Sequence, residues 1–150
     1  MARVTILKKL GPDQAAAANP EIHAALSASA GTGKTQVLTA RVLRLLLGGA
    51  APETILCLTF TKAAAAEMAV RLNRELGRWA VADDAGLAAE LAALLTRPPT
   101  PAEAAGARTL FAEVLELAGG MRILTIHAFC QTLLRAFPLE AGLPPQFTVL

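Results

Sequence analysis

The sequence predicts an α/β fold in which a parallel sheet is flanked by helices; the sheet is expected to be incomplete in this chain. Three observations support the prediction. Short apolar runs typical of buried strands alternate with stretches of helical period. A glycine-rich turn joins the first apolar run to the first long helix. Over about residues 78–120 the helical pattern continues without a strand, which indicates a helical insertion.

The glycine-rich turn runs from Ser27 to Thr35 and reads Ser-Ala-Ser-Ala-Gly-Thr-Gly-Lys-Thr. It follows the apolar run Ile22–Leu26, which we predict to be a strand, and precedes residues 36–47, whose apolar side chains recur with helical spacing. Strand, glycine-rich loop, Gly-Lys-Thr and helix, in that order, are typical of a loop that binds phosphate groups. The alternative is an ordinary glycine turn followed by a helix that begins with a lysine.

The residue types of this loop suit a nucleoside triphosphate. Gly31 and Gly33 lack a Cβ, so the backbone can wrap closely round an anion, and the following helix directs its unpaired amides and positive dipole end at the same place. Lys34 supplies a charge for the β- and γ-phosphates, and the Thr35 hydroxyl is suited to bind Mg2+. Ala28 stands where the strict pattern has glycine.

The remaining elements follow from hydrophobic period and from the positions of glycine and proline. Further strands are predicted at residues 54–60 and 122–126. Since a helix separates the first two strands, a right-handed βαβ unit is expected, with the ligand at the carboxyl ends of the strands. The predicted helices cover residues 15–18, 36–47, 61–76, from 83 or 84 to 95, 102–117 and 127–137, and another strand begins at Phe147. Three acidic residues of the insertion are interpreted as a solvated face: Glu103, Glu113 and Glu116.

Gln14 is a candidate contact to a nucleotide base. It is the last residue of a turn signal at residues 10–14, directly before the short helix predicted at residues 15–18. Its amide offers the donor and the acceptor that the N6 and N7 edge of adenine requires. The alternative is an exposed residue at the start of a helix.

The ends of the second and third strands carry a second set of candidates. Thr59 and Thr61 offer hydroxyls, Phe60 a stacking face and Lys62 a charge, which together suit single-stranded nucleic acid. The alternative is that Phe60 is strand core and Thr61 an N-cap. His127, at the third strand-to-helix junction, is expected at the same edge as the glycine-rich loop, and we assign it no acid–base role.

Composition limits the class of protein. Hydrophobic residues make up 54% of the chain and charged residues 17%, which favours a folded protein over a disordered one. The net charge of +2 permits a nucleic-acid partner without indicating one. Cys57 and Cys130 lie in apolar segments, and we expect reduced core residues of a cytoplasmic protein, with a disulfide as the alternative. Neither a signal peptide nor a membrane span is expected.

The order of four motifs resembles the amino-terminal ATPase domain of UvrD/Rep-type superfamily 1 DNA helicases, a RecA-like P-loop NTPase fold. Pro12-Asp13-Gln14 resembles the Q motif, and residues 28–35 resemble the Walker A loop, whose first position is commonly alanine in this family. The segment Thr59-Phe60-Thr61, with Ala64, Glu67 and Met68, resembles motif Ia. The segment Thr125-Ile126-His127, with Phe129, resembles motif Ib. Residues 58–68, 126–130 and 137–142 look most like the AddA branch, helicase–nuclease subunits of double-strand-break repair.

The resemblance implies ATP and Mg2+ as cofactors, single-stranded and duplex DNA as partners, and an AddB-like partner subunit. It implies that Gln14 contacts adenine, that Lys34 is catalytic by stabilising transferring charge, and that Thr35 holds the metal. The nucleotide would be held by Gln14, Ala28, Ser29, Ala30, Gly31, Thr32, Gly33, Lys34 and Thr35. The single-strand path would be lined by Thr59, Phe60, Thr61, Thr125 and His127. In motif Ia, Lys62-Ala63 replaces the common Asn-Lys pair.

The sequence also lacks features that ATP hydrolysis needs. No acidic pair ends a strand, no arginine from a second RecA-like domain can be named, and no nuclease motif is present. We therefore expect residues 1–150 to be the beginning of a longer helicase, or a truncated reading frame, that binds nucleotide weakly without turnover. The alternatives are another phosphate-loop enzyme, such as a kinase, and a non-catalytic remnant.

Overall fold

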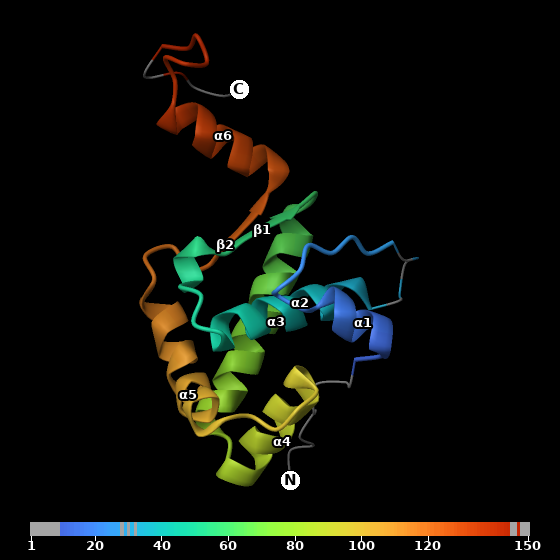
Figure 1. Ribbon diagram of the computed structural model, residues 1–150. Coiled ribbons are helices and arrows are strands. Elements are labelled where there is room, and N and C mark those ends of the chain that lie inside the picture. The colour runs from blue at the N-terminus through green and yellow to red at the C-terminus, as the bar shows by residue number, and fades with distance from the viewer. Residues whose placement is uncertain (1–9, 28, 30, 32, 145–146, 148–150) are drawn as a thin grey trace.

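The computed structural model describes residues 10–27, 29, 31, 33–144 and 147 (Figure 1). Of the strand expected from Phe147, residues 148–150 lie outside this description. The elements, in chain order, are α1 (Pro12–Ala17), α2 (Lys34–Leu47), the 3-10 helix η1 (Pro52–Thr54), β1 (Leu56–Thr59), α3 (Lys62–Val81), α4 (Asp84–Leu95), α5 (Pro101–Glu116), β2 (Arg122–Thr125) and α6 (Ile126–Ala136).

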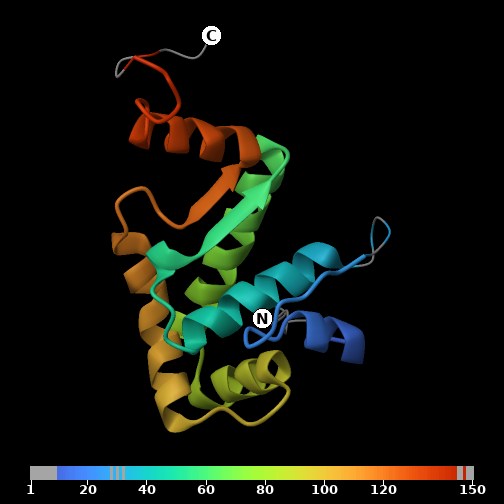
Figure 2. The same cartoon turned by 45° about the horizontal axis from the view of Figure 1, so that its top comes forward.

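The sheet of the described residues consists of β1 and β2, which pair in parallel from Leu56 opposite Arg122 to Thr59 opposite Thr125. The chain between the two strands forms α3, α4 and α5, and α3 packs against both strands. Figure 2 shows α6 beyond the carboxyl ends of the strands, away from α4 and α5. The predicted α/β class and these two strands are confirmed.

The prediction of a strand at Ile22–Leu26 is wrong. These residues have no assigned strand, their side chains are exposed, and they pair with neither strand of the described sheet. The carbonyl oxygen of Ile22 instead accepts a hydrogen bond from Arg41 Nη2 at 2.7 Å. Alanines occupy two of the five positions and have low strand propensity, so an apolar run without a neighbouring strand stays irregular. The predicted βαβ unit with residues 54–60 is therefore not formed.

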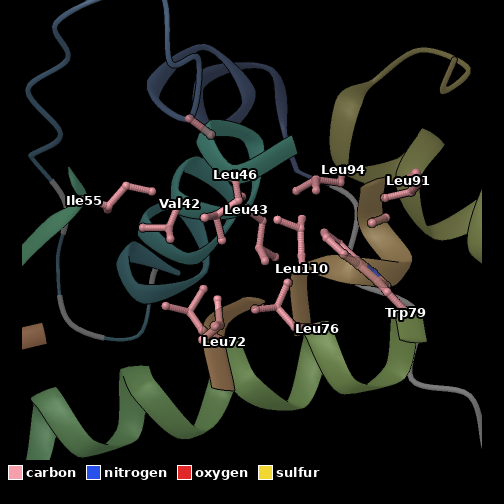
Figure 3. Close-up of a cluster of buried hydrophobic side chains, with 14 of the residues drawn as sticks. Val42, Leu43, Leu46, Ile55, Leu72, Leu76, Trp79, Leu91, Leu94 and Leu110 are labelled. Atoms are coloured by element: carbon pink, nitrogen blue, oxygen red, sulfur yellow. The ribbon is translucent and has the colours of Figure 1, made fainter. Parts of the chain in front are cut away.

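The hydrophobic core lies among four helices, α2 to α5 (Figure 3). Leucines of α2 and α3 meet leucines of α4 and α5, and the indole of Trp79 is fully buried among them. The residues of the predicted helical insertion thus share one core with the helix that follows the glycine-rich loop. The largest fully buried apolar side chains are Trp79, Leu43, Leu72, Leu76, Leu87 and Leu91.

Helix α3 is longer than predicted because Gly77 does not end it. The helix continues to Val81, and a Cβ at Gly77 would lie 3.5 Å from the ring of Phe111 on α5. The glycine therefore lies at a close approach of two helices, where packing offsets its poor helix propensity. After α2 the chain turns at Gly49, which has a left-handed φ of 88°.

The start of α5 corrects the interpretation of Glu103 as part of a solvated face. Its carboxylate accepts hydrogen bonds from Arg97 at 2.6 and 2.9 Å and from the amide of Thr100 at 2.7 Å. In return, the Thr100 hydroxyl accepts from the amide of Glu103 at 3.2 Å, which completes a capping box. Glu113 and Glu116 are exposed as predicted.

The pH dependence of this capping box is predictable. The hydrogen bonds from Arg97 lower the pKa of Glu103 from 4.5 to about 2. Because the folded-state pKa is the lower one, the stabilisation is complete above about pH 4.5 and is lost as the pH falls toward 2. We expect Glu103→Gln to lower the free energy of unfolding by at most about 1 kcal/mol at pH 7, and by progressively less below pH 4.5.

Urea unfolding at several pH values measures this difference, with the exposed Glu116→Gln as the matched control. An equal loss at every pH would show that the charge of Glu103 does not stabilise α5.

Both cysteines are free. Burial raises the pKa of the Cys57 thiol on β1. The expectation of a core position is wrong for Cys130, because α6 buries none of its side chains against the rest of the described chain. In the part of the chain that the structure describes, no helix has the length and apolar character to cross a membrane.

Candidate nucleotide site and strand-end surface

The glycine-rich loop leads directly into α2, whose first residue is Lys34. Gly31 and Gly33 have φ angles of 81° and 90°, a left-handed conformation that side chains with a Cβ rarely adopt. Gly33 is the N-cap and has no side chain to accept from the first amides of α2. The helix therefore presents its N-terminal amides and positive dipole end to the loop.

Lys34 reaches back across the loop, and its Nζ donates to the carbonyl oxygen of Ser29 at 2.8 Å. The ammonium group is therefore held over the loop by a backbone acceptor. Thr35 is half-buried in the first turn of α2, where its carbonyl oxygen accepts from the Thr39 hydroxyl at 2.8 Å. Ala28, Ala30 and Thr32, also predicted to bind nucleotide, lie outside the described residues.

Gln14 lies next to the loop although it is far away in sequence. A Cβ built on Gly33 would lie 3.0 Å from Gln14 Nε2, so the glycine leaves the space that this amide occupies. The other end of the amide, Oε1, accepts from the Gly11 amide at 3.0 Å and caps α1. Gln14 is half-buried rather than an exposed helix start.

These features fit a nucleoside phosphate. The left-handed glycines, the start of α2 and the ammonium group of Lys34 offer positive electrostatic potential at one place, with a side-chain amide beside it. No cluster of three or more His, Cys, Asp or Glu that could hold a metal occurs among the described residues. A divalent cation at this site would therefore depend on phosphate oxygens and on a hydroxyl such as that of Thr35.

The carboxyl ends of β1 and β2 form a second candidate site. Thr59 and Thr125 are register partners at the last position of each strand. Thr61 caps α3 by accepting from the Ala64 amide, and Thr125 caps α6 by accepting from the Ala128 amide, each at 3.1 Å. Two helices therefore begin at the same edge of the sheet.

Around these caps lies a group of exposed side chains. Phe60 is 87% exposed, which excludes the alternative that it is strand core. The N-cap reading of Thr61 is correct, while Lys62 and His127 are exposed in the first turns of α3 and α6. We call this group the strand-end surface, and it consists of Thr59, Phe60, Thr61, Lys62, Thr125 and His127. The start of α2 and the strand-end surface lie toward the same side of the molecule (Figures 1 and 2).

Sequence reasoning missed a buried charged cluster between α3 and α4. Glu75 accepts from Arg78 at 2.6 Å, and the same guanidinium also pairs with Glu90. Burial raises the pKa of Glu75, against the opposing effect of Arg78. The spacing of Glu75 and Arg78 suggests a helical pair, but nothing in the sequence points to Glu90. The cluster lies within the helical core, and we assign it a structural role.

Comparison with known proteins shows which family the chain resembles. Residues 10–150 match the family model described as UvrD/REP helicase N-terminal domain. The chain is similar to bacterial proteins whose name describes a subunit of an ATP-dependent helicase/nuclease. It is 36% identical over 142 residues to that of Desulforudis audaxviator, covering 93% of the chain and 10% of the relative. It is also 36% identical over 140 residues to that of Latilactobacillus sakei, covering 93% and 14%. The chain thus spans between a tenth and a seventh of these relatives' length.

Proposed function

This chain belongs to the UvrD/REP helicase family, and we propose that residues 1–150 are the amino-terminal part of a P-loop ATP-binding domain in an ATP-dependent DNA helicase. The observation that carries the proposal is the position of Gln14 beside Gly33 at the start of α2. This position supports the proposal, because a side-chain amide of the kind that can contact a base lies next to a helix N-terminus of the kind that can hold phosphates.

In this proposal the loop from residue 28 to Thr35 holds the phosphates of ATP. Lys34 exchanges the carbonyl oxygen of Ser29 for phosphate oxygens, which are stronger acceptors because they are charged. Bound Mg2+ would be held by the Thr35 hydroxyl and would neutralise phosphate charge. Gln14 is close enough to the loop to contact adenine, and its capping bond to Gly11 fixes the orientation of its amide.

We further propose that the strand-end surface binds single-stranded DNA. An exposed phenylalanine beside two helix N-termini offers a stacking face for a base and positive dipole ends for the backbone phosphates. Lys62 and the hydroxyls of the surface add a charge and hydrogen-bonding groups.

The proposed role of the whole protein follows from its relatives. Their name describes a subunit of an ATP-dependent helicase/nuclease, which supports a helicase role for the whole protein. We propose that the whole protein translocates on single-stranded DNA and unwinds duplex DNA in double-strand-break repair in the cytoplasm, with an AddB-like partner. Neither β1 nor β2 is followed directly by an acidic residue, since Phe60 and Ile126 come next. We therefore propose that residues 1–150 alone bind ATP without multiple turnovers.

Titration of the purified chain with Mg-ATP and with a fluorescein-labelled oligo(dT) tests this function. For the DNA arm, we expect Phe60→Ala to weaken oligo(dT) binding by about 1–3 kcal/mol, a factor of about 5 to 150, because one base loses its stacking partner. Fluorescence anisotropy gives the dissociation constants. Phe60→Trp, which keeps an aromatic face, should retain binding.

Val81→Ala is the matched control, because Val81 is 85% exposed and is the last residue of α3, the helix that begins beside Phe60. Equal oligo(dT) affinity of the wild type and Phe60→Ala would rule out the strand-end surface as the DNA site.

A further inference from the structure

Arg41 of α2 is hydrogen-bonded to three backbone carbonyls that follow Gln14 in the chain. Its Nη1 donates to the carbonyl oxygens of Ala17, at 3.2 Å, and Asn19. Its Nη2 donates to that of Ile22 at 2.7 Å. One guanidinium thus ties the end of α1 and the segment leading into the glycine-rich loop to the side of α2.

Arg44, three residues further along α2, is buried and joins two helices. Its Nη1 donates to the carbonyl oxygen of Ala15 in α1 at 2.9 Å. Its Nε and Nη2 both donate to the carbonyl oxygen of Leu94 near the end of α4, at 2.9 and 2.6 Å. Because α1 and α4 share this guanidinium, the position of α1 is also coupled to the core helices.

These contacts matter because α1 is short. It has six residues, and a helix of that length is unstable without tertiary contacts. The last four carbonyls of any helix lack partners within the helix. In α1 these include Ala15 and Ala17, the two carbonyls that Arg44 and Arg41 satisfy. Positive charges at the carboxyl end of α1 also complement its dipole.

The packing of α1 on α2 determines where the side chain of Gln14 lies. This residue lies in α1, whereas Gly33 and Lys34 belong to the start of α2. The distance between the amide of Gln14 and the loop is therefore set by how α1 lies on α2. Arg41 is about 10 Å along α2 from Lys34, at 1.5 Å per residue, so one rigid helix carries both the phosphate-binding end and the two arginines.

We propose that Arg41 and Arg44 are positioning residues for nucleotide selectivity, which hold α1 on α2 so that Gln14 faces the base of a nucleotide whose phosphates occupy the loop. This inference rests on the proposed function. Lysine cannot replace either arginine, because its single ammonium group cannot donate to carbonyls spread over two or more segments. An arginine that only stabilised the fold would leave the preference between bases unchanged.

The experiment compares the dissociation constants of Mg-ATP, Mg-GTP and Mg-tripolyphosphate for the full chain and its variants. The variants are Arg41→Lys, Arg44→Lys, Gln14→Ala and the double variant Gln14→Ala/Arg41→Lys, with Arg71→Lys as control. Arg71 lies on α3 and pairs with Glu67. Amide hydrogen exchange at Ala15 and Ala18, which donate to Gly11 and Gln14, reports the stability of α1 without any ligand.

We expect Arg41→Lys and Arg44→Lys to reduce the preference for ATP over GTP roughly three- to tenfold, as Gln14→Ala does, with little change for tripolyphosphate. Exchange at Ala15 and Ala18 should speed up. The double variant should match Gln14→Ala, because both changes remove one contact. The inference would be overturned if both lysine variants kept the wild-type preference for ATP over GTP, or the wild-type exchange rates at Ala15 and Ala18. It would also be overturned if the double variant lost more of this preference than Gln14→Ala, by the product of the two single effects. If the wild type binds none of the three ligands, the proposed nucleotide-binding function itself is rejected. If Gln14→Ala changes the preference for ATP over GTP but the two lysine variants do not, only the positioning role of the arginines is rejected.

Discussion

Trp79→Ala is expected to destabilise the chain by roughly 3–5 kcal/mol, the usual cost of emptying a large aromatic site in a core. Trp79 has an exposed fraction of 0%, and Figure 3 shows its ring among leucines of the neighbouring helices. The indole Nε1 has no hydrogen-bond partner within the described part of the chain, so the loss is one of packing. Since domains are typically stable by 5–15 kcal/mol, this single change can remove most of the stability.

Urea unfolding followed by circular dichroism measures the change. Trp79→Phe keeps most of the ring and loses no hydrogen bond, so it should cost much less. Val81→Ala, two residues away but exposed, should stay within about 0.5 kcal/mol of the wild type. A loss below about 1 kcal/mol for Trp79→Ala would mean that the four helices do not pack round this residue.

Lys34→Ala is expected to weaken Mg-ATP binding roughly ten- to hundredfold. A hydrogen bond to a charged group contributes about 1.5–3 kcal/mol, and the ammonium group already lies over the loop through its bond to the Ser29 carbonyl. Isothermal titration calorimetry of the chain measures the affinity. Because ligand binding stabilises only the folded state, the rise in melting temperature with Mg-ATP should shrink in parallel.

Arg135→Ala provides the control for charge, since it removes one exposed cation from α6, away from the loop. It should leave the affinity for Mg-ATP unchanged. Equal affinities of Lys34→Ala and the wild type would exclude a role of this lysine in phosphate binding.

Local signals predicted much of the fold. The helical period of residues 36–47, the aspartate before α4 and the apolar run at residues 122–126 each predicted an element that the structure contains. The predictions were wrong where contacts between residues far apart in the sequence determine the local structure. The run Ile22–Leu26 found no strand to pair with, and Gly77 lies inside a helix because the ring of Phe111 packs against it.

The candidate site was predictable to a similar extent. Motif order pointed to Gln14, the glycine-rich loop and the strand ends, and the structure brings Gln14 to Gly33 and Thr59 to Thr125. Their roles toward ATP and DNA remain predictions. Arg41 and Arg44 were not predictable, because a guanidinium that donates to backbone carbonyls leaves no pattern of side-chain types in the sequence.

The central claim is that the start of α2 and its glycine loop hold nucleotide phosphates. Adding Mg-ATP to the 15N-labelled chain and recording amide chemical shifts tests it most directly. We predict that the largest shifts occur at Gly31, Gly33 and Lys34, with a smaller shift of the Gln14 side-chain amide. Unchanged resonances for these residues in a folded sample, with Mg-ATP at millimolar excess, would contradict the account.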